Sequence, residues 1–452
     1  MKRLCKLKWL IAAGTLLIAG CATLDYHPLS LTEELQYFEK NQKTFTADRE
    51  WWKQYNNAEL NRLVETALAN NPDYIKAALN INKELYNLNL TNSDLFPTLY
   101  GTLSASSQRR IDTGDNFSSN FSGELGLNYE VDLYGKIRDL NEAQEFEYKA
   151  TVMDRETARL SLVNSVVDLY FNLEYLNNSI SVSQKNIAAY QNIRNIAEAK
   201  YKSGKADNLE FLEAKQSLLS EKNRLLELET QFKEMETSLK NILNATDMPK
   251  IKFADILSQK QLGVNTEVPL SVLAARPDLA ASQYRLEKAF KNLEAENKNW
   301  YPDITLKGAL GSNSDKARTT FDFPFVLGSV SVDLPFLDWN RVKNNIKLSE
   351  ADYRIAEVEF KDVLNQALNE VGYYYFAYAK AAGMYANTAE NYKNSRQITK
   401  YYSDRYNSGK IEFKDYLEAL NKENSLKADL IQQKYQIIKY ENYVYKAMAG
   451  KY

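Results

Sequence analysis

The sequence predicts an α+β membrane protein in which two tandem structural repeats form each protomer and three protomers form one tube. In this prediction a 12-stranded β-barrel, with four strands from each protomer, continues into a long α-helical barrel. Three observations support it. Motifs recur at a constant offset of 205 residues, helical runs approach 70 residues, and segments about ten residues long alternate apolar and polar side chains.

The N-terminus has the features of a secretory signal peptide over residues 1–20. Basic residues precede an apolar stretch, Leu10–Ile18, that is too short to span a bilayer. It runs into Leu17-Ile18-Ala19-Gly20-Cys21, the pattern of a bacterial lipobox, so we expect cleavage before Cys21 and acylation of that cysteine. Ala22, rather than Asp, resembles an outer-membrane sorting signal. The alternative is an ordinary secretory signal with a chance cysteine.

The composition argues against an enzyme. His27 is the one histidine, Cys5 would leave with the signal, and Cys21 would carry lipid. The sequence contains no metal-ligand cluster, nucleophile elbow, P-loop or dinucleotide fingerprint. The net charge of −2 becomes about −6 once the signal is removed, with no basic patch for nucleic acid. We therefore expect no catalysis, cofactor, metal or nucleic-acid partner.

The 205-residue repeat indicates that one half-protein was duplicated. We expect a tether and equatorial segment at 21–56, a first repeat at 57–248, an equatorial linker at 249–270 and a second repeat at 271–452. The motifs that match are Asn71-Pro72-Asp73 with Arg276-Pro277-Asp278, Tyr201-x-x-Gly204-Lys205 with Tyr406-x-x-Gly409-Lys410, and Leu212-Glu213-Ala214 with Leu417-Glu418-Ala419. The two halves should occupy equivalent places in one architecture.

Long stretches nearly free of Gly and Pro predict one long helix in each repeat, at about 136–203 and about 340–407. At ~1.5 Å per residue each helix is about 100 Å long. Apolar residues between 160 and 180 fall on two neighbouring heptad seams, which predicts a helix packed on two sides. Shorter helical runs flank the long ones. Gly204 and Gly409 are expected to form tight helical reversals.

Each repeat also predicts one β-hairpin, at about 98–132 and about 303–335. The alternation is clear in one strand, where the apolar side has Phe121, Leu125, Leu127 and Val131 and the polar side has Ser122, Glu124, Asn128 and Glu130. A half-buried soluble sheet has the same period. We favour transmembrane strands because the hairpins belong to an exported chain and lie directly beyond the long helices.

Four strands cannot close a barrel in a membrane. Open sheet edges leave backbone groups unpaired in lipid, and each such group costs several kcal/mol. Copies must therefore join around a symmetry axis. Two copies give eight strands, which is too narrow for a channel, and three copies give twelve. A homotrimer is the simplest closed solution with a pore.

Five motifs together resemble the TolC-like outer-membrane efflux channel family, in its lipoprotein branch (OprM, NodT and CusC-like). The resemblance covers essentially all of Cys21–Tyr452. The motifs, in order, are Trp51-Trp52, Asn71-Pro72-Asp73, Tyr129-Glu130-Val131-Asp132-Leu133-Tyr134-Gly135-Lys136, Leu273-Ala274-Ala275-Arg276-Pro277-Asp278-Leu279, and Tyr406-x-x-Gly409 with Leu417-Glu418-Ala419. The family implies a trimeric tube with an equatorial region, here from 30–56, 249–270 and the C-terminus. The junction at 334–340 departs from the family pattern.

The resemblance also implies a gate at the periplasmic tip, where the helices converge. Matched residue by residue, the gate residues are Asp415, Glu418, Glu210, Tyr406 and Tyr201. The tip turns that a periplasmic adaptor protein would contact are Gly204, Lys205, Gly409 and Lys410. The alternative readings are carboxylates on solvated helix faces and bare solvated turns.

The function implied by the resemblance is that of a passive exit duct in a tripartite efflux system, exporting small toxic compounds. Its partners would be the homotrimer itself, a periplasmic adaptor (membrane fusion) protein, an inner-membrane RND-type pump and outer-membrane lipid. It would be lipid-anchored in the cell outer membrane and would span the periplasm. The alternatives are the outer-membrane channel of a type I protein secretion system and a coiled-coil structural lipoprotein without a channel. The substrate does not follow from the sequence.

Overall fold

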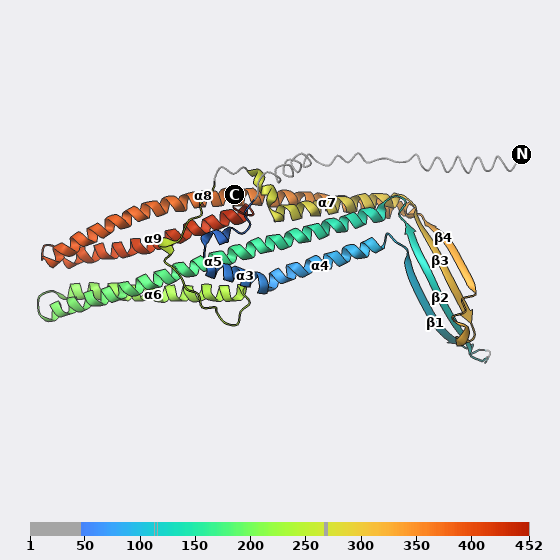
Figure 1. Ribbon diagram of the computed structural model, residues 1–452, viewed down its shortest axis with the longest axis horizontal. Coiled ribbons are helices and arrows are strands. Elements are labelled where there is room, and N and C mark those ends of the chain that lie inside the picture. The colour runs from blue at the N-terminus through green and yellow to red at the C-terminus, as the bar shows by residue number, and fades with distance from the viewer. Residues whose placement is uncertain (1–46, 113, 115, 266–269, 452) are drawn as a thin grey trace.

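Two very long helices and one four-stranded sheet organise the computed structural model (Figure 1). The structure describes residues 47–112, 114, 116–265 and 270–451, so Cys21 lies outside the described residues. Helices α5 (Lys136–Lys202) and α8 (Trp339–Asn407) run the length of the helical part, about 100 Å at ~1.5 Å per residue. Within the described ranges, none of the helices has the length and apolar character needed to cross a bilayer.

Two shorter helices lie end to end beside each long one (Figure 1). Helices α4 (Pro72–Ser93) and α6 (Asn208–Ile242) contact α5, whereas α7 (Pro277–Asn297) and α9 (Phe413–Ala447) contact α8. Helix α5 also contacts α7, α9 and the short α3 (Ala58–Asn70). This explains the two apolar seams of α5, since it has neighbours from both repeats.

The sheet joins the two repeats at one end of the molecule. Its order is β1-β2-β3-β4, all antiparallel, so β2 of the first repeat pairs with β3 of the second. The strands are β1 (Thr98–Gln108), β2 (Ser118–Val131), β3 (Asp303–Ser314) and β4 (Phe325–Asp333). One row of cross-strand partners is apolar and consists of Leu125, Leu310 and Val326. A second row is polar and consists of Asn128, Lys307 and Ser329. Because partners share a face, one side of the sheet is apolar and the other is polar.

The two strand-to-helix junctions differ in geometry. In the first repeat Gly135 precedes α5 with a φ of +79°, a left-handed conformation that favours glycine. In the second repeat a short 3₁₀ helix, Pro335–Asp338, precedes α8, and the Asp338 carboxylate accepts a bond from the Arg341 N–H at 3.4 Å. Residues 334–340, which depart from the family pattern, therefore make the turn without a glycine.

Ion pairs between α5 and α7 hold the repeats together in the half nearest the sheet. Lys288 lies 3.0 Å from Glu147, and Lys291 lies 2.9 Å from Glu142. Arg285 makes two bonds to Asp154, two turns further along α5. In these pairs the bases are on α7 and the acids on α5, and Lys291 also pairs with Glu294 of its own helix at 2.8 Å.

The largest apolar core lies at the equator, where segments far apart in the sequence meet. Trp51 is fully buried and donates its indole N–H to Asn442 Oδ1 at 3.0 Å. Asp48 and Lys451 form an isolated antiparallel bridge. The fully buried apolar members of this core include Leu60, Val64, Val166, Val167, Phe171, Leu173, Leu239, Leu243, Ile256 and Ile438. Residues 47–56, the described part of the linker and the C-terminal end of α9 thus meet in one core, while 30–46 and 266–269 lie outside the described residues.

Candidate functional site at the helical tip

Two helix–turn–helix reversals lie at the end of the molecule farthest from the sheet (Figure 1). In the first, Gly204 has a φ of +69° and donates its N–H to the Tyr201 carbonyl at 2.9 Å. The next N–H, from Lys205, reaches back to the Lys200 carbonyl at 2.9 Å. This six-residue closure is the Schellman motif, in which glycine is favoured because of its positive φ. Gly409, with a φ of +67°, makes the same closure in the second repeat.

The helices that leave these two turns begin differently. The Asp207 carboxylate caps α6 by accepting the Leu209 N–H at 2.9 Å. Glu412, at the equivalent place in the second repeat, makes no side-chain cap bond. The residue after it, Phe413, is instead buried to 4% exposure in an apolar cluster with Tyr190 and Leu218. One turn is therefore fixed by a polar cap and the other by apolar packing.

Tyr406 connects the two repeats. Its ring stacks on Tyr416 of α9, with centroids 5.6 Å apart and planes 8° from parallel. The Lys200 ammonium of α5 donates to the Tyr406 hydroxyl at 2.5 Å and lies 4.4 Å from the ring centroid. A cation–π contact and a charge-assisted hydrogen bond therefore link the end of α5 to the end of α8.

A second link between the repeats lies further from the tip. The Tyr190 hydroxyl of α5 donates to Asn421 Oδ1 at 2.6 Å and accepts from Asn424 Nδ2 at 3.0 Å, both on α9. Burial raises the pKa of the Tyr190 phenol. We call this link, together with Lys200–Tyr406, the tip latch. The motifs of the sequence did not identify Lys200, Tyr190, Asn421 or Asn424.

The latch is not repeated by symmetry. Arg405, which is equivalent to Lys200, bonds to Tyr401 on its own helix rather than across to the other repeat. Tyr201, which is equivalent to Tyr406, has an exposed side chain (46%). The structure therefore brings Tyr406 into a contact between repeats and leaves Tyr201 on the surface. The two tyrosines of the predicted gate therefore have different surroundings within one protomer.

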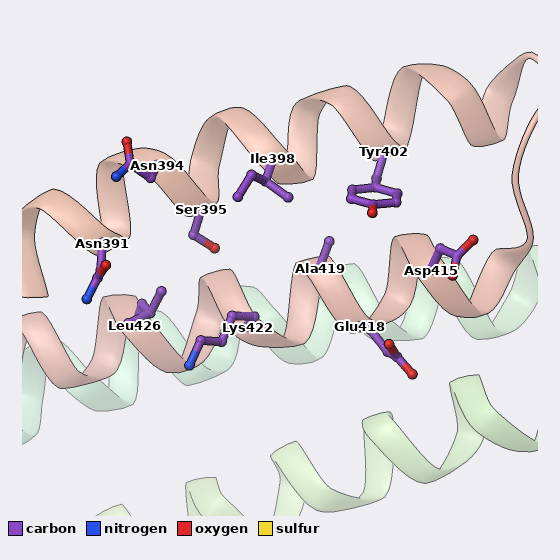
Figure 2. A pocket seen from close by; sticks show the side chains of 10 residues that line it. All are labelled: Asn391, Asn394, Ser395, Ile398, Tyr402, Asp415, Glu418, Ala419, Lys422 and Leu426. Atoms are coloured by element: carbon purple, nitrogen blue, oxygen red, sulfur yellow. The ribbon is translucent and has the colours of Figure 1, made fainter.

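Asp415 and Glu418 line a groove of about 540 Å³ between α8 and α9 (Figure 2). Tyr402 points from α8 towards α9 in this groove. The other lining residues are Asn391, Asn394, Ser395, Ile398, Ala419, Lys422 and Leu426. Lys414 lies 3.9 Å from Glu418, and both side chains are mostly exposed, so solvent screens this pair. The two carboxylates lie in the first two turns of α9, which begins at Phe413.

Glu210 differs from the other two carboxylates. It lies in the first turn of α6 and is partly buried, and its Oε2 has no hydrogen-bond partner among the described residues. The side chains of Lys205 and Lys410 are exposed at the two turns. The described residues include no group of three or more His, Cys, Asp or Glu side chains placed to hold a metal ion. The tip thus offers bonds between helices and a set of carboxylates.

The chain belongs to the family described as "Outer membrane efflux protein", whose sequence profile matches residues 63–245 and again 268–450. The second match begins 205 residues after the first, at 268 rather than 63, which is the offset of the repeated motifs. The fold and the family agree with the resemblance to TolC-like channels. The protein is an efflux protein of the outer membrane.

Named relatives cover nearly the whole chain. It is 39% identical over 450 residues to "Toxin and drug export protein A" of Aggregatibacter actinomycetemcomitans, with 99% of this chain and 98% of that protein aligned. It is 40% identical to an uncharacterized protein of Haemophilus influenzae, with 98% of each chain aligned. Among solved structures, CusC superposes with a TM-score of 0.83 at 18% identity, over 90% of this chain and 96% of that one. The Campylobacter jejuni CmeC outer membrane channel gives 0.82 at 24% identity, over 90% and 89%.

Proposed function

We propose that three copies of this chain close into a tube that is the exit duct of a tripartite efflux system. The two outer sides of the protomer are the observation that supports a closed ring of copies. In the half near the sheet, α5 and α7 lie between α4 and α8. In the half near the tip, α5 and α9 lie between α6 and α8. One side of the protomer is thus formed by β1, α4 and α6, and the other by β4 and α8.

Both sides carry large apolar residues that a neighbouring copy would cover. On the first side, Leu79 and Leu90 of α4 are 59% and 67% exposed. On the other, Leu348 and Val358 of α8 are 65% and 66% exposed. Pairing β4 of one copy with β1 of the next would also satisfy the two open sheet edges. Three copies give twelve strands, with the apolar face towards lipid and the polar face towards the channel.

The proposed gate and the proposed contacts to the other proteins of the system both lie at the helical tip. We assign the gate to Asp415, Glu418, Glu210 and Tyr406, held by the tip latch. The turns at Gly204, Lys205, Gly409 and Lys410 would receive a periplasmic adaptor protein that is joined to an inner-membrane RND-type pump. Energy for export would come from the pump, because the duct only has to open and close.

We further propose that Cys21 is the mature N-terminus and carries lipid. A relative from Salmonella typhimurium, 24% identical over 436 residues, bears the name "Probable outer membrane lipoprotein SilC". The mass of the mature protein measures this directly. It should equal Cys21–Tyr452 plus acyl chains, and a mass without acyl chains would refute the anchor.

Export of proteins is the second candidate. The Aggregatibacter relative is named for both toxin and drug export, so its name does not separate the two kinds of cargo. The coiled-coil lipoprotein without a channel has less support, because a pure coiled coil needs no four-stranded sheet with one apolar face.

Deletion of the chain and reconstitution of the purified protein test this function together. A deletion strain should become sensitive to drugs, detergents or metals, and the full chain should restore resistance. The purified protein should migrate as a heat-labile trimer and form discrete channels in planar bilayers. A stable monomer without channel activity would refute the duct. Restored secretion of a protein, without restored resistance, would favour the second candidate.

Replacing Asp415 by alanine tests the gate assignment. Three copies of Asp415 around one axis would place like charges together, where a pair costs a few kcal/mol at an effective dielectric constant of about 20. Asp415→Ala should therefore raise single-channel conductance or weaken block by divalent cations, measured in planar bilayers. The matched control is Asp247→Ala, which removes an exposed carboxylate near the equatorial core, away from the tip. Conductance and block equal to those of the control would remove Asp415 from the gate.

A further inference from the structure

The linker between the repeats is fastened to α5. We call residues 250–265 the strap. The Asn178 amide of α5 donates to the Ala254 carbonyl at 2.8 Å. The Gln259 amide of the strap donates to Glu174 Oε1 at 2.7 Å. Phe253 packs against Tyr170, with ring centroids 6.1 Å apart, and Ile256 is fully buried. The first half of the strap is thus bonded to the first repeat and anchored there by Ile256, while Ala254, Asp255 and Ser258 are exposed.

The second half of the strap is fastened to α9 and the C-terminus. The Gly263 N–H donates to Glu441 Oε1, and the Tyr445 hydroxyl donates to the Gly263 carbonyl at 2.6 Å. The Lys451 ammonium donates to the Leu262 carbonyl at 3.3 Å. The strap therefore spans from α5 of one repeat to α9 of the other. These are also the two helices that Tyr190 joins nearer the tip.

Two buried glutamates face the strap, and only one is fully bonded. Glu441 is fully buried, with Oε1 bonded to Gly263 and Oε2 accepting from the Tyr55 hydroxyl at 2.8 Å. Glu174 is also fully buried, but its Oε2 has no hydrogen-bond partner among the described residues. A buried carboxylate with one oxygen unbonded is unfavourable when it is charged, so this position favours the neutral acid.

The groups around Glu174 do not supply a compensating cation. The pKa of Glu174 is raised to about 7, mainly because the carboxyl is buried. The charge of Asp255 also raises this pKa, whereas the bonds from Gln259 and the Ala254 backbone lower it. Charged groups on the other elements packed in this core include Glu59 of α3, which acts on Tyr170, and Arg224 of α6 with Asp429 of α9, which act on Tyr175. Lys233 and Glu236 of α6 pair with each other. On α9, Glu441 acts on Lys434, and Lys439 acts on Asp168.

We propose that the strap is a proton-controlled brace across α5 and α9, which Glu174 holds closed while neutral and loosens when it ionises. An ionised Glu174 needs water at Oε2, and water reaches it only if the segment 254–259 lifts away from α5. Burial raises the pKa of Glu441 as well, but both of its oxygens are bonded, so the contact to α9 would remain. Loosening would therefore free the first repeat to move relative to the second.

The direction of the pH dependence follows from the raised pKa. A carboxyl whose pKa is about 7 in the closed strap and 4.5 in water favours the closed form most at low pH. The closed form loses this advantage as the pH rises from the aqueous pKa towards the pKa in the closed strap. Linkage between these two values gives a roughly tenfold rise in the opening equilibrium between pH 6 and pH 8. The strap should be firm in an acidified periplasm and loose in an alkaline one.

Hydrogen exchange on the intact protein in detergent or nanodiscs tests the brace. After correction for intrinsic exchange rates, the amides of 254–259 should exchange about ten times faster at pH 8 than at pH 6. Glu174→Gln should abolish this change and keep the strap protected at both values. Glu229→Gln, the same change on an exposed side chain of α6, should leave the wild-type profile unaltered.

Two outcomes would overturn the brace. One is equal protection of 254–259 at pH 6 and pH 8 in the wild-type protein. The other is an unchanged pH dependence in a folded Glu174→Gln protein. If Glu174→Gln fails to fold, Gln259→Met serves instead. It removes the side-chain donor that Glu174 has among the described residues, so the pKa of Glu174 in the closed strap should rise. The pH-dependent increase in exchange should then extend to higher pH, and an increase over an unchanged pH range would refute the role of Glu174. None of these readouts depends on channel activity, so they remain decisive even if the proposed duct function is wrong.

Discussion

Replacing Arg276 by methionine should lower the free energy of unfolding by about 3–5 kcal/mol, the usual cost of removing one partner from a buried ion pair. Arg276 is 8% exposed and bonds to Asp278 at 2.6 Å, Glu370 at 2.9 Å and the Ala447 carbonyl at 2.8 Å. Burial alone would raise the pKa of Asp278, but the bond and charge of Arg276 lower it. Without the guanidinium, the partly buried Asp278 carboxylate would lose this cation, and Glu370 would keep Lys446 at 3.7 Å.

Thermal or denaturant unfolding of the purified protein measures this loss. Arg396→Met, on the exposed surface of α8, is the control and should change stability by less than about 0.5 kcal/mol. Adding Glu370→Gln to Arg276→Met should recover part of the loss, because it removes one of the two carboxylates that lose the guanidinium. A loss below about 1 kcal/mol for Arg276→Met would show that this network does not hold α7, α8 and α9 together.

Breaking the tip latch should favour the open channel. Tyr190→Phe keeps the ring in its cluster but removes the hydroxyl that joins Asn421 and Asn424. Lys200→Met removes the bond to Tyr406. Each loss is worth about 1 kcal/mol, so the double variant should raise the open-to-closed ratio roughly 5- to 100-fold in each protomer. Single-channel recording should show longer or larger openings, and cells should become sensitive to large antibiotics.

The matched control for the latch is Tyr401→Phe. It makes the same chemical change on a tyrosine whose hydroxyl bonds to Arg405 within one helix, so it breaks no contact between repeats. The latch would be disproved if the double variant conducted like this control. It would be disproved equally if Tyr401→Phe opened the channel as much as the double variant.

Much of the fold followed from local sequence signals. Absence of Gly and Pro marked α5, a run without Pro and with only two Gly marked α8, and an alternating pattern marked the strands. Gly204 and Gly409 were predictable because a Schellman closure needs a residue that tolerates positive φ. The offset between motifs also indicated the duplication before any contact was known. These features depend on residues close together in the sequence or on simple repetition.

The latch and the strap did not follow from such signals. Tyr190 and Asn421 are far apart in the sequence, and their bond requires α9 to pack on α5 as well as on α8. The motif match placed equal weight on Tyr201 and Tyr406, but only Tyr406 meets a lysine from the other repeat. A polar asparagine at 421 and another at 424, one turn apart on a helix, was the available signal. It gained meaning only once the neighbour of that face was known.

The strap also determines how motion at the two ends of the tube is related. At one end the repeats share a continuous sheet, and between it and the equator ion pairs join α5 to α7. Beyond Glu174, α5 continues to Lys202, a lever arm of about 42 Å at ~1.5 Å per residue. A tilt of about 10° at the strap would therefore displace the tip by about 7 Å while the sheet end stays still. Small changes at the equator would be amplified where the duct opens, so the stiffness of this pivot governs how far the tip can swing.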